Sequence, residues 1–339
     1  MKFWQFTGEK TAELSDGSEM IESATAAKVK LTRCLLNRND VSAFLGDAPS
    51  YPLVPGSFGV GLVVETGDNC FGLEKNMRVY LNPFETCNNC HNCKNGNPSC
   101  CLNLKTAGQN TEGFLRDFAV CPSQQLYSLP DSVSEDDAVF IEYISLALKV
   151  IDTLDIQKGD HVAVLGFNTL GNILCQLIMY YQGVPILVDS DPENVETAKK
   201  AGVYYITEAT AAAIKNVSSL TSGRMADKVV HTCDPAIDTK LAFQLAAYGC
   251  KMAFAGFDYG PIRMNLSHAM KKQLVIYSLK NGIGNTSSAI NLLANKALST
   301  SLILKHKATF SSPLEALTEE AAHMEEEKKV YPIAVDMMN

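Results

Sequence analysis

Residues 161–178 read HVAVLGFNTLGNILCQLI, and this stretch decides the fold of the chain. A short apolar run leads through Gly166 into a second apolar segment that is long enough for a helix. Similar runs without polar alternation recur downstream, at 184–189, 203–207, 227–233, 250–256 and 273–279. Runs of this kind are typical of strands buried on both faces, and the segments between them have the pattern of helices. We therefore predict an α/β fold with a doubly wound parallel sheet.

The N-terminal part of the chain has a different pattern. Residues 1–135 contain short β-prone runs broken by Gly, Pro and Asn, which predict an antiparallel, barrel-like domain. A chain of 339 residues is long enough for two domains. We expect 1–135 to form the barrel, 136–285 the parallel-sheet domain, and 286–339 a return to the barrel, with a last strand near 330–337.

Composition and charge exclude several classes of partner. The net charge is −8 and the basic residues are scattered, which argues against a nucleic-acid surface. No apolar run approaches the roughly 18 residues that a membrane span needs, and the start MKFWQFTGEK lacks the apolar core of a signal peptide. We expect a cytoplasmic protein that acts on a small molecule, with neither a nucleic-acid nor a membrane partner.

The turn after the first parallel strand carries a dinucleotide fingerprint with one change. Gly166 permits the tight turn, and Gly171 permits close packing of the helix on the strand. Asn168 replaces the middle glycine; Asn tolerates left-handed backbone angles, but its side chain occupies space that a phosphate would use. With Thr169 and Leu170 at the start of the helix, these residues are the predicted pyrophosphate site.

Asp189 ends the second predicted strand, 18 residues beyond Gly171. A carboxylate at this place accepts hydrogen bonds from a ribose diol and repels a 2′-phosphate. The sequence therefore favours NAD(H) over NADP(H). A domain of this fold that has lost nucleotide binding is the alternative.

Four cysteines, Cys87, Cys90, Cys93 and Cys101, have the spacing C-x2-C-x2-C-x7-C. Four thiolates satisfy tetrahedral Zn²⁺ and leave no position open for a substrate, so we predict one structural zinc ion per chain. Cys100 is an alternative fourth ligand, but the spacing favours Cys101. We call residues 87–101 the cysteine lobe.

Together these motifs, with PGSFGVGLVVETG and LPDSVSEDDA, resemble the medium-chain dehydrogenase/reductase superfamily, which includes zinc-containing alcohol and sorbitol dehydrogenases. The resemblance covers essentially the whole chain. It implies a GroES-like β-barrel catalytic domain with a structural zinc in the cysteine lobe, and a Rossmann domain that binds NAD(P). It also implies a homodimer or homotetramer.

The catalytic zinc ligands of that family do not match. Asn37 stands where family enzymes carry a ligand cysteine, Ser57 stands at the histidine of their PGHE motif, and Glu142 matches their third ligand. An amide, a hydroxyl and one carboxylate are a poor donor set for Zn²⁺. The segments LLNRND and PGSFGVG are instead similar to the zinc-independent quinone oxidoreductase and enoyl reductase branch, although that branch normally lacks the cysteine lobe and uses NADPH.

Other positions complete the predicted site. The resemblance implies that Arg38 contacts the cofactor pyrophosphate, although a surface arginine is an equal alternative. Asn39 stands where the family begins its proton relay, and an amide is a poor relay. Glu142 and Tyr143 are the better candidates for a proton donor.

Three hypotheses about function follow from these residues. The first is an NAD(H)-dependent oxidoreductase without catalytic zinc, which reduces an activated C=C, C=N or C=O bond by direct hydride transfer. The second is a catalytically silent relative that binds a nucleotide or a partner protein. The third is a zinc alcohol dehydrogenase with unorthodox ligands.

Overall fold

The computed structural model of the chain describes residues 1–18, 20–256, 264, 266–327 and 329–338. The chain divides into two compact units. Unit 1 comprises Met1–Glu142, Thr286–Asn295 and Ile303–Asn339, and unit 2 comprises Tyr143–Asn285 and Lys296–Leu302.

Unit 2 contains a six-stranded parallel sheet in the order β12-β11-β10-β13-β14-β15. The strands are β10 (His161–Leu165), β11 (Val184–Val188), β12 (Tyr205–Thr207), β13 (Ala226–His231), β14 (Ala246–Ala255) and β15 (Val275–Leu279). The strand order reverses between β10 and β13, which confirms the predicted doubly wound sheet and puts its switch point beside the glycine turn.

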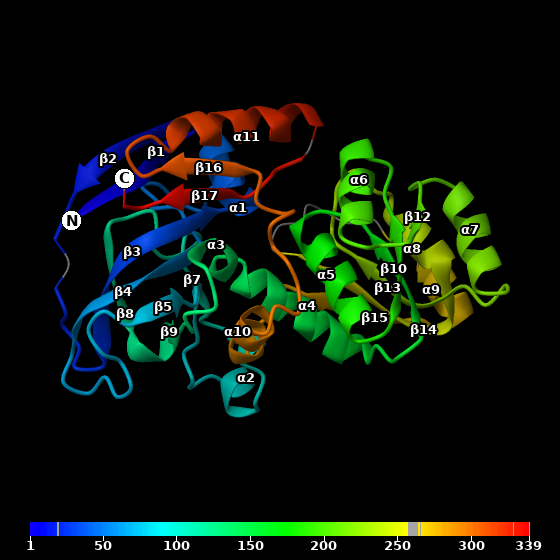
Figure 1. The fold of residues 1–339 in the computed structure, drawn as a ribbon, viewed down its shortest axis with the longest axis horizontal. Coiled ribbons are helices and arrows are strands. Elements are labelled where there is room, and N and C mark those ends of the chain that lie inside the picture. Colours follow the sequence, from blue (N-terminus) through cyan, green and yellow to red (C-terminus); the bar gives the residue numbers. More distant parts are fainter. Residues whose placement is uncertain (19, 257–263, 265, 328, 339) are drawn as a thin grey trace. The chain divides into compact units, whose positions relative to one another are not determined.

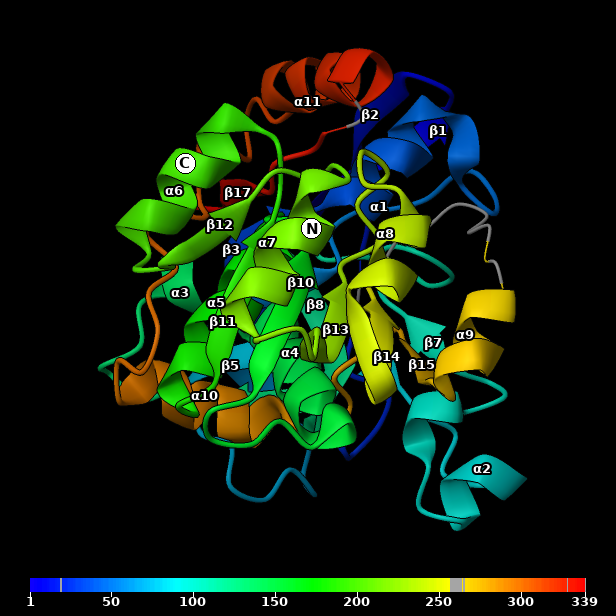
Figure 2. The same cartoon turned by 90° about the vertical axis from the view of Figure 1, so that its right-hand side faces the viewer.

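Helices cover both faces of this sheet, with α5 and α6 on one face and α7, α8 and α9 on the other (Figures 1 and 2). The helices are α4 (Ile141–Leu154), α5 (Thr169–Tyr180), α6 (Pro192–Lys200), α7 (Ala212–Leu220), α8 (Thr239–Leu245) and α9 (Leu266–Lys272). Because both faces are covered, Val162, Ala163, Val164 and Leu165 are all completely buried. This burial explains why the strand sequences lack alternation.

Unit 1 contains a seven-stranded sheet in the order β16-β17-β3-β4-β5-β9, with β8 paired to β3. The strands are β3 (Ala26–Leu36), β4 (Phe58–Thr66), β5 (Arg78–Leu81), β8 (Phe118–Pro122), β9 (Leu126–Ser128), β16 (His306–Thr309) and β17 (Ile333–Asp336). Two smaller pairs are β1 (Lys2–Gly8) with β2 (Thr11–Asp16), and β6 (Phe84–Glu85) with β7 (Lys105–Thr106). The pairing is antiparallel except between β16 and β17.

The helices of unit 1 are short apart from two C-terminal ones. They are α1 (Arg38–Ser42), the π turn Ala43–Asp47, α2 (His91–Lys94), the 3-10 turns Pro98–Cys100 and Ser123–Gln125, α3 (Glu135–Ala138), α10 (Thr286–Ala294) and α11 (Leu314–Glu327). Within the described ranges, no helix in either unit is both long and apolar enough to cross a bilayer.

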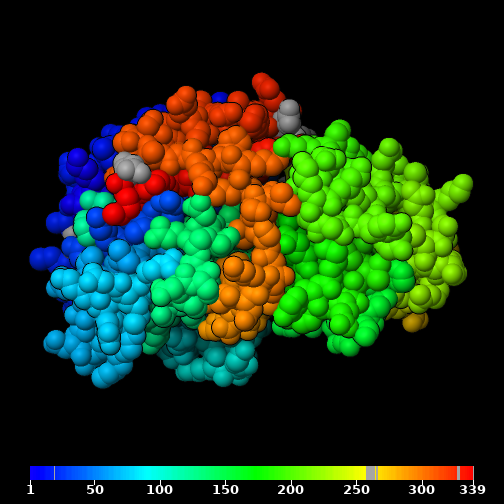
Figure 3. All heavy atoms as spheres, viewed as in Figure 1, coloured from blue at the N-terminus to red at the C-terminus, as the bar shows by residue number. Residues whose placement is uncertain are grey.

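The C-terminus returns to unit 1 as predicted. Strand β17 pairs antiparallel with β3, so that Ile333 is opposite Leu36 and Asp336 is opposite Arg33. In the space-filling view, the red and orange atoms of this return lie against the blue N-terminal residues (Figure 3). The ends of the chain therefore build one hydrophobic core, to which Phe6, Leu36 and Val335 all contribute.

The bounds of the units differ from the expected ones at two places. Residues 136–142 remain in unit 1 because Asp136 of α3 accepts hydrogen bonds from Arg33 and Lys307, both of unit 1. Residues 296–302 belong to unit 2 because Ser299 and the side chain of Gln176 on α5 exchange two hydrogen bonds, of 2.8 and 2.9 Å.

Candidate active site and metal centre

The turn between β10 and α5 requires its two glycines. Gly166 has a φ of +96°, and a Cβ atom there would lie 2.4 Å from Oγ1 of Thr232. A Cβ atom on Gly171 would lie 1.9 Å from the carbonyl oxygen of Gly166. Helix α5 therefore begins tightly against the strand, and the first N–H groups of the helix, at Thr169 and Leu170, have no acceptor within the helix. This is the geometry in which a helix N-terminus binds a phosphate.

Asn168 is the N-cap of α5, and its backbone is extended (φ −66°, ψ −175°). The left-handed conformation considered for this residue is therefore not used, because the turn is made at Gly166. The Asn168 side chain accepts a hydrogen bond from the N–H of Gly171 at 3.1 Å and donates one to the carbonyl oxygen of Thr232 at 3.2 Å. The Asn168 side chain thus already accepts the hydrogen bond of the Gly171 N–H group, which a pyrophosphate could otherwise accept.

Asp189 lies directly after β11 and is only 4% exposed. Its carboxylate accepts hydrogen bonds from the N–H groups of Phe167 (2.8 Å) and Asp191 (2.9 Å) and from Nδ2 of Asn194 (3.0 Å). A carboxylate has about four acceptor positions, so these bonds leave little capacity for a ribose diol. Asp189 ties the glycine turn to the start of α6.

Asn37 begins α1 as its N-cap, in a capping box with Asp40. The Oδ1 atom of Asn37 accepts a hydrogen bond from the N–H of Asn39 at 2.8 Å, and the N–H of Asn37 donates to Oδ2 of Asp40 at 2.8 Å. The Nδ2 atom of Asn37 is buried and has no hydrogen-bond partner among the described residues. Arg38 and Asn39 follow as the first residues of the helix, and both are half-buried.

Asp40 also links α1 to the loop that carries Ser57. Its Oδ1 atom accepts a hydrogen bond from the N–H of Gly56 at 2.7 Å. Gly56 has a φ of +95°, and a Cβ atom there would lie 2.5 Å from the Cys34 sulfur. Asp40 is completely buried, and burial raises the pKa of its carboxyl to about 7.

Ser57 lies between Gly56 and the first residue of β4 and is 2% exposed. Its Oγ atom is buried and, within the described part of the chain, has no hydrogen-bond partner. Asp40 thus holds together the two segments, 37–40 and 56–57, that carry the predicted Asn37 and Ser57.

Glu142 lies in the first turn of α4 and is completely buried. The next residue, Tyr143, is 8% exposed. A residue that the sequence analysis missed, Tyr80 on β5, is also completely buried. Burial and the charge of Glu142 raise the pKa of Tyr80 well above its ordinary value, so the phenol stays protonated.

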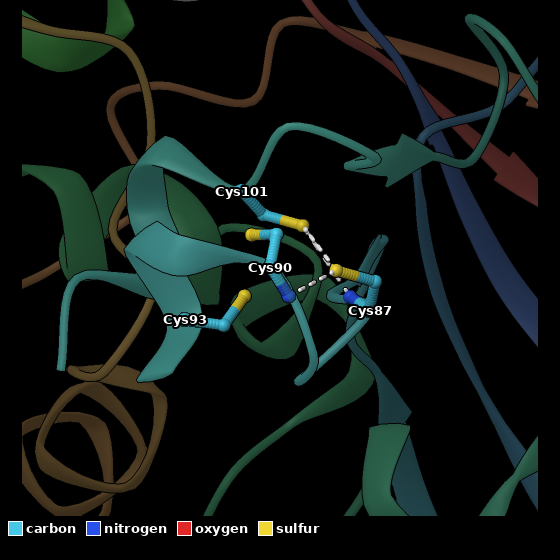
Figure 4. Close-up of side chains that lie close together, drawn as sticks. All are labelled: Cys87, Cys90, Cys93 and Cys101. Carbon is cyan, nitrogen blue, oxygen red and sulfur yellow. Dashed lines mark hydrogen bonds between the residues drawn. The ribbon is translucent and has the colours of Figure 1, made fainter. Parts of the chain in front are cut away.

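The four predicted zinc ligands converge from the two ends of the cysteine lobe (Figure 4). The sulfur atoms of Cys87, Cys90, Cys93 and Cys101 all lie within 4.8 Å of one another, and Cys100 is exposed and outside the cluster. Tetrahedral Zn–S bonds of about 2.3 Å require sulfur atoms roughly 3.8 Å apart, so the cluster fits zinc.

Backbone N–H groups prepare this cluster for a cation. Cys87 donates from its N–H to the Cys101 sulfur at 3.3 Å, and Cys90 donates to the Cys87 sulfur at 3.4 Å. Hydrogen bonds from the backbone at Asn89 and Cys90 lower the pKa of Cys87 to about 6. A zinc ion requires thiolates, and Cys87 supplies one near neutral pH.

Two family models match the chain. The alcohol dehydrogenase GroES-like domain matches residues 23–131, and the zinc-binding dehydrogenase model matches residues 169–295, so that together they cover more than half of the chain. The chain belongs to the medium-chain dehydrogenase/reductase superfamily. It is an oxidoreductase-family protein of the zinc-type alcohol dehydrogenase-like kind.

Relatives of this dehydrogenase/reductase share its length but little identity. An uncharacterized zinc-type alcohol dehydrogenase-like protein of Haemophilus influenzae is 26% identical over 296 residues, 86% of each chain. The sorbitol dehydrogenase of Halalkalibacterium halodurans is 25% identical over 291 residues, 84% of this chain and 85% of the relative. The crystal structure of the short chain alcohol dehydrogenase RspB from Escherichia coli CFT073, complexed with NADH, has a TM-score of 0.88 with 20% identity and covers 99% of each chain.

Sequence reasoning missed Asp40 and Tyr80. The spacing Asn37-Arg38-Asn39-Asp40 is a capping-box signal that marks Asp40 as structurally engaged. No local signal identifies Tyr80, because a tyrosine within RVYL reads as an ordinary strand residue.

Proposed function

We propose that this chain is a nicotinamide-dependent oxidoreductase that transfers a hydride without a catalytic zinc ion. The observation that carries the proposal is the pair Asn37 and Ser57, whose Nδ2 and Oγ atoms are buried and lack hydrogen-bond partners among the described residues. Buried polar atoms of this kind are rare and are explained most simply by a ligand that binds them. Their donors suit a neutral, oxygen-bearing substrate.

The donor set at these positions does not fit zinc. Asn37 uses its Oδ1 atom as a helix cap, its Nδ2 group cannot ligate a cation, and a neutral amide oxygen is a weak ligand for zinc. Ser57 supplies a hydroxyl, and Glu142 supplies a carboxylate. Zinc prefers thiolate, imidazole and carboxylate ligands, so one carboxylate with an amide and a hydroxyl is a poor donor set.

The cofactor that we propose is NAD(H), held by unit 2. The glycine turn and the N-terminus of α5 are built for a pyrophosphate, and the carboxylate of Asp189 disfavours a 2′-phosphate. Arg38 is retained as a proposed cofactor contact from α1. When bound, a reduced nicotinamide supplies the hydride.

The residues of unit 1 would orient the acceptor and stabilise its charge. The Asn37 amide and the Ser57 hydroxyl, fixed by Asp40, donate hydrogen bonds to the substrate oxygen. Such preorganised donors replace part of the stabilisation that a metal gives, and removing one typically costs about 10²–10³ in kcat. Tyr143 and Glu142 remain the proposed proton donors. The substrates that need no metal are those with an electron-poor C=C, C=N or C=O bond.

The experiment is a measurement of NADH binding and NADH oxidation against enals, enones and cyclic imines. We expect saturable NADH binding, and oxidation that falls about 10²–10³-fold in Ser57→Ala. The absence of NADH and NADPH binding would refute the proposal.

A second candidate is a catalytically silent relative, and a specific observation favours it. Asn168 caps α5 with its own side chain, and Asp189 already accepts three hydrogen bonds, so the protein satisfies for itself groups that would bind a dinucleotide. This candidate predicts weak or absent cofactor binding that Asn168→Gly restores. The third, a zinc enzyme with unorthodox ligands, predicts two zinc ions per chain.

A further inference from the structure

A third buried polar atom shares the property that distinguishes Asn37 and Ser57. The hydroxyl of Tyr80 is buried and has no hydrogen-bond partner in the described part of unit 1. Neither the family motifs nor the strand pattern singles out Tyr80. Its hydroxyl therefore needs an explanation of its own.

The strand position of Tyr80 directs its ring away from the main core of unit 1. Its neighbours Val79 and Leu81 belong to that core, and alternate residues of a strand point to opposite faces of the sheet. Tyr80 is the register partner of Val60 on β4 and of Tyr127 on β9. Ser57 lies directly before β4, three residues from Val60, so Tyr80 and Ser57 belong to neighbouring segments.

Electrostatics connect Tyr80 to a second predicted site residue. The charge of Glu142 acts on the phenol of Tyr80, and both side chains are completely buried. Burial, and after it the charge of Glu142, raise the pKa of the phenol, so Tyr80 keeps its proton and is a hydrogen-bond donor at every physiological pH. The Tyr80 hydroxyl can therefore donate a hydrogen bond to a negatively charged oxygen, but it does not act as a phenolate.

A hydroxyl in this position destabilises the protein unless something binds it. Leaving a buried hydroxyl unsatisfied is costly, whereas phenylalanine would fill the same volume without that cost. A ligand that accepts a hydrogen bond from Tyr80 would remove this cost.

We propose that Tyr80 is a substrate-binding residue that donates a hydrogen bond to the oxygen of an α,β-unsaturated aldehyde or ketone. This inference rests on the proposed function. As the hydride adds to the β-carbon, the C=C π electrons shift to form an enolate whose negative charge lies on the oxygen, and Tyr80 stabilises that oxygen without giving up its proton. The proposed proton donor, Tyr143 or Glu142, then protonates the α-carbon and is reprotonated from water, so atoms and charge balance with one NADH and one proton consumed.

The test compares Tyr80→Phe with Tyr127→Phe, the same change on the neighbouring strand. We expect Tyr80→Phe to lower kcat/KM for trans-2-hexenal about 10²–10³-fold and to leave NADH affinity and reduction of the cyclic imine 2-methyl-1-pyrroline unchanged. It should also raise the melting temperature by about 2–4 °C, because the unsatisfied hydroxyl is removed. Tyr127→Phe should alter none of these quantities.

Three results would overturn the inference. A lower melting temperature for Tyr80→Phe would mean that the hydroxyl has a partner within the protein. Unchanged turnover of hexenal by Tyr80→Phe would show that Tyr80 does not bind the substrate. Equal losses of activity with hexenal and with the imine would indicate a structural role for Tyr80.

The failure of the proposed function is distinguishable from the failure of this inference. If the wild-type protein oxidises no NADH, binding of hexanamide, an unreactive carbonyl compound, is measured by calorimetry. Saturable binding that Tyr80→Phe abolishes would support the role of Tyr80 in a silent relative. Equal binding, or none, by both proteins would overturn it.

Discussion

The carboxylate of Asp40 accepts a hydrogen bond from the backbone N–H of Gly56 at 2.7 Å, across 16 residues of chain. Its other oxygen accepts from the N–H of Asn37 at 2.8 Å. One completely buried side chain therefore fixes the two segments that carry the proposed substrate donors Asn37 and Ser57.

The Asp40 carboxyl predicts a pH-dependent stability. Burial raises its pKa to about 7 in the folded protein, above the unfolded value of about 3.9. Between these values the folded state binds one proton more than the unfolded state, so the contribution to stability falls as the pH rises and levels off above about 7. The difference in unfolding free energy between wild type and Asp40→Asn should fall by about 2–3 kcal/mol from pH 5 to pH 7.

Urea unfolding of both proteins at several pH values measures this difference, because all other titrating groups cancel. A difference that is constant from pH 5 to pH 8 would show that Asp40 is ionised throughout. The account of its burial would then be wrong.

We expect zinc binding to depend on the four clustered cysteines of the cysteine lobe and not on the nearby Cys100. Cys93→Ser removes one of the four clustered thiols, and we expect loss of the zinc ion and rapid proteolysis within residues 87–101. Cys100→Ser is the matched control, because Cys100 is exposed and outside the cluster. Zinc content and limited proteolysis measure both. Retention of zinc by Cys93→Ser, or its loss from Cys100→Ser, would show that the ligands are misassigned.

Replacing Asn168 with glycine should lower the stability of the protein and raise its affinity for the cofactor. Asn168→Gly frees the N–H of Gly171 for a phosphate and removes the hydrogen bond to Thr232. We expect tighter NADH binding and a loss of about 1 kcal/mol in unfolding free energy. Asp238→Gly, which removes the cap of α8, should lower stability without a change in NADH affinity. Weaker NADH binding by Asn168→Gly would mean that the asparagine itself contacts the cofactor.

The close contact between α5 and β10 leaves no room for a side chain at Gly171. Gly171→Ala would place a Cβ atom 1.9 Å from the carbonyl oxygen of Gly166, so α5 must move away from β10. We expect a loss of about 1–3 kcal/mol in stability and a weaker cofactor site. Gly202→Ala is a useful comparison, since a Cβ atom there meets nothing within 4 Å, although its positive φ of +87° adds backbone strain. Thermal unfolding that ranks Gly202→Ala as the far more damaging change would contradict this reading of the turn.

The sequence predicts the fold of this chain well because its signals are local. The apolar runs from 161 to 279, the glycines of the turn and the cysteine spacing each depend on neighbouring residues, and the six-stranded sheet and the sulfur cluster follow them. The last strand, which pairs with β3, is also read from a short local pattern.

The parts that the sequence did not reveal depend on distant partners. Asp40 reaches Gly56, and Tyr80 is singled out by the burial of its hydroxyl and by the charge of Glu142, 62 residues away. The same is true of Asn168. Its backbone is extended, and its side chain is held by a hydrogen bond to the distant carbonyl oxygen of Thr232. The unit bounds at 142 and 296–302 likewise depend on side-chain hydrogen bonds that have no local pattern.

The central claim is hydride transfer without a catalytic zinc ion. Its most direct test is NADH oxidation with an enal by protein whose zinc content is measured on the same sample and after addition of excess zinc. The account predicts one zinc ion per chain, measurable oxidation, and no increase with added zinc. Oxidation that appears only when a second zinc ion binds, or no oxidation at all, would contradict it.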